Sequence, residues 1–273
     1  MQRITSSIIL FILMAAFPVN SARTEEKQIL LREDFTTLDN WKPLYFPKIK
    51  KHSSYTIEKD GDRHYLKAES NASASAIVYK ESFSVHDYPK AKWQWKVDNI
   101  YVKGDPRRKE GDDYSIRVYV MFEYDPEKAG FGERIKYSLA KSMYGEYPPH
   151  SSLSYVWANR EDPETIMTSP YTDKAKMVLL EKGQNKVGTW EDEEVNILED
   201  YQNAFGTKPP ARARIAVMND SDNTGESSVF AEWSGVEGSA ISRTHHRGHR
   251  EAQRGLSKHR VFFFCLPCGG PLV

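Results

Sequence analysis

Short stretches in which apolar and polar residues alternate constrain the fold of this chain more than any other feature. In the segment KWQWKV, residues 92–97, an apolar side chain recurs at every second residue. This spacing places all the apolar side chains on one face of a β-strand. The same spacing recurs at Ile116, Val118, Val120, Phe122 and Tyr124. Both stretches predict strands with one buried face and one face that contacts water.

Six further short segments have strand character. They are residues 65–68, 76–79, 153–158, 175–180, 214–218 and 228–233. The segments lack the regular alternation with helices that indicates βαβ units and a parallel sheet. The pattern therefore predicts a mainly β domain, an antiparallel β-sandwich of jelly-roll type.

Two segments predict short accessory helices over the edge of the sandwich. The first has an apolar residue at every fourth position, at Phe131, Ile135, Leu139 and Met143, and ends before Gly145. This stripe is typical of a helix that packs through one face. The second begins with four acidic residues, 191–194, which suit the first turn of a helix because they face the positive end of its dipole. Apolar residues follow up to Phe205, before Gly206.

The two ends of the chain differ from the middle. Arg3, the apolar run 8–17 and the small residues up to Ala22 predict a signal peptide over residues 1–22 and export to the periplasm or the exterior. The apolar run is shorter than the roughly 20 residues that span a bilayer, and no later segment is longer or more apolar. We therefore expect no transmembrane segment in the mature protein.

Charge and cysteine content bear on the partners and chemistry of the domain. The chain has 38 Lys and Arg and 38 Asp and Glu, but its last 37 residues, 237–273, are basic and contain both cysteines, Cys265 and Cys268. The remaining domain, residues 23–236, is mildly acidic and has no thiol. Since phosphate binding needs clustered basic residues, we expect no nucleic-acid partner.

Seven segments of the chain resemble a bacterial family of exported proteins, domain-of-unknown-function family 3047. They are WKPLYFPKIKKHSSY (41–55), WQWKVDNI (93–100), EGDDYSIRVYVMFEYDPE (110–127), ERIKYSLAKSMYGEYPP (133–149), YVWANR (155–160), SPYTDKAKMVLLEKG (169–183) and DSDNTGES (220–227). The resemblance implies one exported sandwich domain and no established activity. Because the chain departs from the family pattern after the last segment, we expect residues 237–273 to lie outside the domain and to arise from a shifted or extended reading frame.

The segment DSDNTGES is a candidate metal loop. Asp220, Asp222, Asn223 and Glu226 offer the hard oxygen ligands that calcium prefers, and calcium is the one cofactor that the sequence suggests. The twelfth position of a helix-loop-helix calcium site is Ala231 rather than Glu, which excludes that type of site. The alternative is a polar turn in which Asp and Asn bond their own backbone.

Catalytic candidates are few. Glu123 and Asp125 have a spacing that resembles the catalytic strand of laminarinase-like β-glucanases, in which paired carboxylates cleave a glycosidic bond. Pro126 interrupts the strand directly afterwards, which favours a solvated turn instead. The sequence contains no G-x-S-x-G motif.

Aromatic residues indicate a carbohydrate ligand. The chain has five tryptophans up to residue 190, and sugar rings stack on aromatic planes while polar side chains bond their hydroxyl groups. We expect Trp157, Asn159 and Arg160 to do this at the end of one strand. Asp112 and Asp113 are further ligand-binding candidates, although a salt bridge to Arg107 or Arg108 is the alternative role, and Trp93 and Trp95 have the spacing of core residues.

The preferred interpretation is an exported β-sandwich that binds a carbohydrate or another polar ligand of the cell envelope without catalysing its turnover. The first alternative is a glycan hydrolase or lyase that uses Glu123 and Asp125. The second is a structural envelope protein without a small ligand.

Overall fold

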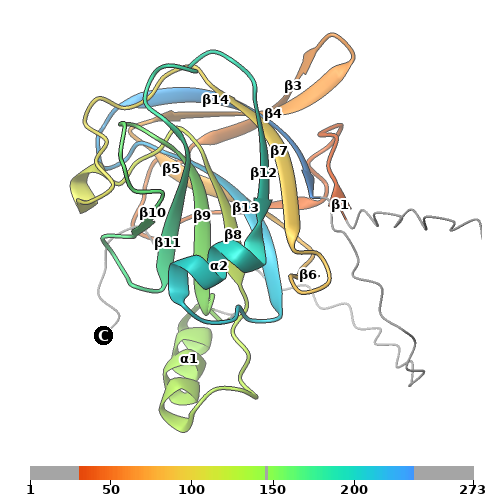
Figure 1. Cartoon of the computed structure of the whole chain (residues 1–273), viewed down its shortest axis with the longest axis vertical. Helices are drawn as coiled ribbons and strands as arrows, with labels where there is room; N and C mark the ends of the chain where they lie inside the picture. Colours follow the sequence, from red (N-terminus) through yellow and green to blue (C-terminus); the bar gives the residue numbers. More distant parts are fainter. Residues whose placement is uncertain (1–30, 145–146, 237–273) are drawn as a thin grey trace, which may run out of the picture.

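The computed structural model describes residues 31–144 and 147–236 (Figure 1). The predicted signal peptide, residues 1–22, and the tail, residues 237–273, lie outside the described residues. Among the residues described, no helix has the length and apolar character needed to cross a membrane.

The first of two sheets has six strands. They are β1 (Leu31–Arg32), β3 (Ser54–Asp60), β4 (Arg63–Asn71), β7 (Lys90–Val97), β12 (Glu191–Asn196) and β14 (Ser227–Val236). Their order across the sheet is β12-β7-β14-β4-β3, and β1 pairs with the far end of β14. All pairs in this sheet are antiparallel.

The second sheet has eight strands. They are β2 (Trp41–Leu44), β5 (Ala74–Tyr79), β6 (Phe83–Ser84), β8 (Arg117–Phe122), β9 (Ser151–Ala158), β10 (Ile166–Thr168), β11 (Ala175–Lys182) and β13 (Arg212–Asp220). Their order is β10-β11-β9-β8-β13-β5-β2, with β6 paired to β13. One pair, β9 with β11, is parallel, which the sequence did not predict.

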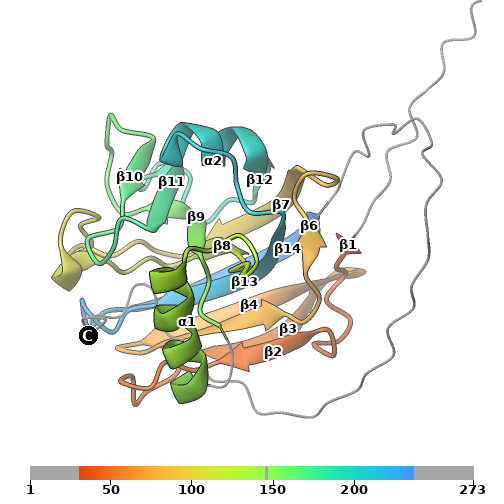
Figure 2. The same cartoon turned by 90° about the horizontal axis from the view of Figure 1, so that it is seen from below.

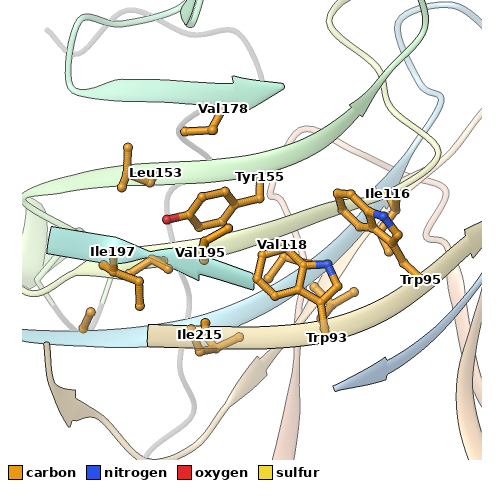
Figure 3. Packing of buried hydrophobic residues seen from close by; sticks show 14 of the residues in the cluster. Trp93, Trp95, Ile116, Val118, Leu153, Tyr155, Val178, Val195, Ile197 and Ile215 are labelled. Atoms are coloured by element: carbon orange, nitrogen blue, oxygen red, sulfur yellow. The ribbon is translucent and has the colours of Figure 1, made fainter. Parts of the chain in front are cut away.

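The two sheets pack face to face, as Figure 2 shows from below, and the predicted mainly β sandwich is confirmed. Alternate residues of β7, β8 and β9 point into the core, among them Trp93, Trp95, Val118, Leu153 and Tyr155 (Figure 3). Trp95 of β7 meets Trp157 of β9 with ring centroids 6.0 Å apart, and Trp93 meets Tyr155 at 5.4 Å. All eight segments predicted as strands contain strands, because alternation is a local property of the sequence.

Helix α2 (Ile197–Phe205) is shorter than predicted, and residues 191–194 are not its first turn. They belong to β12, which pairs with β7. Side chains of the two strands contact one another: Gln94 donates to Asp192, and Lys92 Nζ lies 2.9 Å from Glu194 Oε2. These cross-strand contacts override the local preference of acidic residues for a helix start. The helix begins after Asn196, whose Oδ1 accepts the N–H groups of Leu198 and Glu199.

Helix α1 (Phe131–Tyr144) lies where it was predicted, but its apolar stripe does not face the sandwich. Phe131, Ile135 and Leu139 are 82%, 55% and 58% exposed. The helix packs instead through Tyr137, whose ring stacks on Tyr124 at 3.7 Å between centroids. Figure 1 shows α1 projecting from the end of the sandwich rather than lying over its edge.

Candidate functional site

The predicted sugar-stacking residue, Trp157, lies in the core. Its side chain is 1% exposed, and its Nε1 donates to the carbonyl of Gly183 at 3.1 Å. Trp41, Trp93 and Trp95 are buried as well. The prediction that Trp157 stacks on a ligand is therefore wrong for this structure, because the same alternation that predicts the strand also turns this side chain inwards.

The neighbours of Trp157 do not form a ligand surface with it. Asn159 is buried and ties two segments together: its Oδ1 accepts the N–H of Tyr101 at 2.8 Å, and its Nδ2 donates to the carbonyl of Asp113 at 2.7 Å. Arg160 is about half exposed and pairs with Asp105 at 3.7 Å. Asn159 thus has a structural role.

Asp112 and Asp113 are fully buried and do not contact Arg107 or Arg108, which pair with Asp162, Glu164 and Asp105. The partner of Asp112 is Arg117, the first residue of β8. Arg117 Nη1 lies 3.3 Å from Asp112 Oδ1, and its Nε donates to Asp220 Oδ1 at 3.0 Å. The guanidinium also lies over the ring of Tyr114, 4.4 Å from its centroid. The predicted salt bridge to Arg107 or Arg108 is therefore wrong. Asp112 forms a buried salt bridge with Arg117 instead.

The loop after β13 completes this group. Asp113 accepts the N–H of Thr224 at 2.6 Å and the side-chain amide of Asn223 at 2.9 Å. Gly225 has a φ of +70°, and its N–H bonds the carbonyl of Ser221. The turn interpretation of DSDNTGES therefore fits the backbone, with Asp113 as an additional partner that lies about a hundred residues earlier.

The metal candidates are only partly brought together. Carboxylate oxygens of Asp113, Asp220 and Asp222 lie within 4.8 Å of one another. Glu226 is outside this group, because its two oxygens accept the N–H groups of Val102 and Lys103. Asn223 uses its amide nitrogen on Asp113 and its oxygen on the hydroxyl of Tyr171. We name Asp112, Asp113, Asp220 and Asp222 the acidic cluster.

Burial dominates the electrostatics of the acidic cluster. It raises the pKa of Asp112 to about 6 and the pKa of Asp220 well above its ordinary value, although Arg117 opposes both shifts. The pKa of Asp222 is raised by burial and by the charge of Asp113. Removing carboxylates from water disfavours their charged form, so a single guanidinium does not balance this group.

The catalytic candidates have other partners. Glu123 faces two arginines, with its oxygens 3.3 Å from Arg214 Nε and 3.5 Å from Arg212 Nε. Asp125 accepts the N–H of Glu127 at 3.0 Å, and this bond lowers the pKa of Asp125. Asp125 therefore acts as a turn residue, as the alternative interpretation of this segment holds.

An aromatic surface that sequence reasoning missed lies on the outer face of the six-stranded sheet. Of the five tryptophans whose side chains the structure describes, Trp190 is the one outside the core. Its ring meets Tyr65 of β4 edge-on at 5.8 Å, and both rings are partly exposed. The cationic groups of Arg63 and Lys96 lie 5.6 and 5.5 Å from the centroid of Trp190.

A row of polar side chains lies beside these rings. Arg63 Nη1 donates to Gln94 Oε1, and Gln94 Nε2 donates to Asp192 Oδ1 at 2.6 Å. The three residues come from β4, β7 and β12 and are hydrogen-bonded in sequence across the sheet. We name the Trp190 surface as the set Arg63, Tyr65, Gln94, Lys96, Trp190 and Asp192.

The signal for the Trp190 surface is present but incomplete in the sequence. Tyr65 alternates with the buried Leu66 and Ala68, which places its side chain on the opposite face of the predicted strand. The position of Trp190 opposite Tyr65 depends on the order of β12, β7, β14 and β4, which no local pattern gives.

The sequence profile of the family described as "Protein of unknown function (DUF3047)" matches residues 39–232. The chain belongs to this family. The match confirms the resemblance and contains both the acidic cluster and the Trp190 surface. No curated protein sequence matches the chain.

Several solved structures have a weak similarity to this chain. A family 11 carbohydrate-binding module from Clostridium thermocellum, in complex with a mixed-linked β-1,3-1,4 tetrasaccharide, is 10% identical with a TM-score of 0.37, covering 78% of this chain and 96% of that chain. Endoglucanase 3 of Trichoderma harzianum, from family GH12, is 8% identical with a TM-score of 0.38, covering 78% and 100%. The lectin from Bauhinia forficata, in complex with GalNAc, is 9% identical with a TM-score of 0.35, covering 78% and 99%.

Proposed function

We propose that this protein is an exported, non-catalytic binding protein for a carbohydrate or a similarly polyhydroxylated ligand of the cell envelope, and that the Trp190 surface is its contact. The observation that carries the proposal is the placement of Trp190 outside the core, beside Tyr65 and the hydrogen-bonded row of Arg63, Gln94 and Asp192. Export rests on the sequence of residues 1–22.

The chemistry of this surface suits a sugar. The C–H face of a pyranose ring packs on an indole plane, and a partly exposed tryptophan provides such a plane without a change in the core. Arg63 supplies hydrogen-bond donors, Asp192 supplies acceptors, and Gln94 supplies both. Because these side chains already bond one another, less rotational freedom is lost when hydroxyl groups replace or join those bonds.

Catalysis by Glu123 and Asp125 has less support. A glycosidase needs one carboxyl group that stays protonated near neutral pH, and this requires a raised pKa. The pKa of Asp125 is lowered instead by the backbone of its turn.

The proposal is tested by a glycan array on the purified protein, followed by calorimetric titration with the strongest glycan. We expect Trp190→Ala to weaken binding at least about tenfold, since an indole stacked on a sugar contributes on the order of 1 to 3 kcal/mol. The matched control is Tyr45→Ala, because Tyr45 is 51% exposed and its ring contacts His52 rather than Trp190.

Three results would contradict the proposal. The first is that no glycan binds, which leaves the structural envelope role. The second is that Trp190→Ala and Tyr45→Ala bind alike. The third is release of reducing sugar that is lost in Glu123→Gln, which establishes the hydrolase or lyase alternative.

A further inference from the structure

We propose that Asp113, Asp220 and Asp222 bind one divalent cation of the calcium class, which joins the loop of residues 220–226 to the segment before β8. This inference is independent of the ligand of the Trp190 surface. It retains two of the residues that the sequence suggested for calcium, Asp220 and Asp222, and replaces Asn223 and Glu226 with Asp113.

The spacing of the carboxylates fits a single ion. One oxygen from each of the three residues lies within 4.8 Å of the other two. Calcium–oxygen bonds measure about 2.3 to 2.6 Å, so two ligands on opposite sides of one calcium ion are about 4.6 to 5.2 Å apart. Three oxygens within this limit can contact a common ion after small side-chain rotations that bring them to bonding distance.

Among the residues that the structure describes, one basic side chain bonds the carboxyl groups of the acidic cluster. Arg117 is the cation that bonds it, with contacts to Asp112 and Asp220. Asp113 bonds an amide and a backbone N–H, which are neutral donors. The cluster thus has four carboxyl groups and one guanidinium, which bonds two of them, in a region where Asp112, Asp113 and Asp220 are at most 1% exposed. Burying unpaired charge is costly, and a divalent cation removes most of that cost.

Two oxygens of the acidic cluster point to a missing partner. Asp112 Oδ2 and Asp222 Oδ1 are inaccessible to solvent and have no hydrogen-bond partner among the described residues. Asp112 is fully buried, and its Oδ1 lies 3.3 Å from the Arg117 guanidinium that also bonds Asp220, so its carboxyl group lies beside the three metal candidates. Buried polar atoms in folded proteins are normally satisfied, and a buried acidic oxygen without a protein donor is satisfied by a bound water or an ion.

The donor set selects the type of cation. The group consists of carboxylate oxygens, with no His or Cys among the described residues that share it. Hard oxygen ligands favour calcium or magnesium over zinc and copper. Calcium accepts six to eight oxygens in a flexible arrangement, whereas magnesium needs a near-ideal octahedron and retains several waters. A buried group of carboxylates on two different loops suits the less demanding geometry of calcium.

The first measurement is calorimetric titration of the EDTA-treated full-length protein with calcium chloride, together with its melting temperature. We expect one calcium ion per chain. We also expect the melting temperature to rise by about 5 to 10 °C when free calcium is about 100 times Kd. No heat and no thermal shift up to about 10 mM calcium would overturn the proposal and show that the acidic cluster holds protons instead. Binding of magnesium in preference to calcium would also overturn it.

The second measurement uses Asp222→Asn. Asp222 is partly exposed, and its Oδ1 has no partner, so the change removes a charge without breaking a bond that the structure shows. We expect calcium affinity to fall at least about tenfold because one charged ligand is lost. Without calcium, the melting temperature should be unchanged or higher, because one carboxylate fewer lies within 4.8 Å of Asp113 and Asp220.

The matched control is Asp192→Asn, an exposed carboxylate on the outer face of the six-stranded sheet. It should bind calcium as the wild-type protein does. If Asp222→Asn retains wild-type affinity, or if both variants lose it equally, the acidic cluster is not the calcium site. Since these readouts do not involve a glycan, failure here leaves the proposed function of the Trp190 surface untouched.

Discussion

The acidic cluster and the Trp190 surface are both polar, yet they differ in how their charges are compensated. In the acidic cluster one buried guanidinium bonds two of the four carboxyl groups, those of Asp112 and Asp220. On the Trp190 surface each charged side chain has a neighbour of opposite or neutral character and contacts solvent. The strength of an ionic contact depends on its distance from water, so the first group should control stability and the second should control binding.

The largest effect should come from removing the buried cation. Arg117→Met leaves Asp112 and Asp220 without their counter-charge, and breaking a buried ion pair from one side costs about 3 to 5 kcal/mol. Urea denaturation followed by tryptophan fluorescence measures the change in the free energy of unfolding. The control is Arg107→Met, whose guanidinium is half exposed in its bridge to Asp162 and should contribute less than about 1 kcal/mol. If Arg117→Met and Arg107→Met lowered the free energy of unfolding equally, the buried acidic cluster would not control stability more than an exposed ion pair does.

An intermediate effect is expected at Glu193 of β12, which is partly exposed. Its pKa is raised from 4.5 to about 7, mainly by burial and then by the charge of Glu181. Between these two pH values the folded chain keeps a proton that the unfolded chain has lost. The free energy of unfolding should therefore fall as the pH rises from 4.5 to 7. After allowance for solvent screening, the fall is on the order of 1 to 2 kcal/mol.

The test of this pH dependence is Glu193→Gln. The amide oxygen can still accept the Nε1–H of Trp95, which Glu193 Oε1 accepts at 3.0 Å. We expect the variant to be more stable than the wild-type protein at pH 8 and equal to it at pH 4, as measured by denaturation at both values. If the free energy of unfolding changed with pH in the same way in both proteins, Glu193 would be as well solvated in the folded chain as in the unfolded one.

The smallest effect on stability should come from the Trp190 surface. Asp192→Asn keeps an oxygen for Gln94 and should change the free energy of unfolding by less than about 0.5 kcal/mol. Its effect should appear in glycan affinity, as a fall of a few fold, because one charged acceptor is lost. If Asp192→Asn lowered the free energy of unfolding as much as Arg117→Met, the Trp190 surface would contribute to stability as the acidic cluster does, which would contradict the comparison.

Strands were predictable where their pattern is local, and contacts between distant segments were not. Alternation placed β7, β8 and β9 correctly and also contained the information that Trp157 points inwards. Residues 191–194 were assigned to a helix, because the strand that pairs with them, β7, lies about a hundred residues earlier. Asp113 and Asp220, like Tyr65 and Trp190, are more than a hundred residues apart in the sequence. No local pattern therefore predicted that the members of each pair lie close together.

The exposed stripe of α1 shows a further limit of sequence patterns. An apolar stripe predicts a buried face, but the stack of Tyr137 on Tyr124 turns another face of this helix towards the fold. Aromatic pairs of this kind contribute about 0.5 to 1.5 kcal/mol beyond their buried area. The position of Tyr124 relative to the helix follows from the path of residues 125–130, which carries no periodic signal.

The parallel pairing of β9 with β11 bears on the order in which the sheet assembles. Parallel neighbours cannot be joined by a tight turn, and here the connection of residues 159–174 contains β10, which pairs antiparallel with β11. The hairpin of β10 and β11 closes a short loop, whereas docking of β11 on β9 closes a longer one and has a higher entropic cost. In refolding followed by pulsed hydrogen exchange, amides that bond β10 to β11 should therefore gain protection before those that bond β11 to β9.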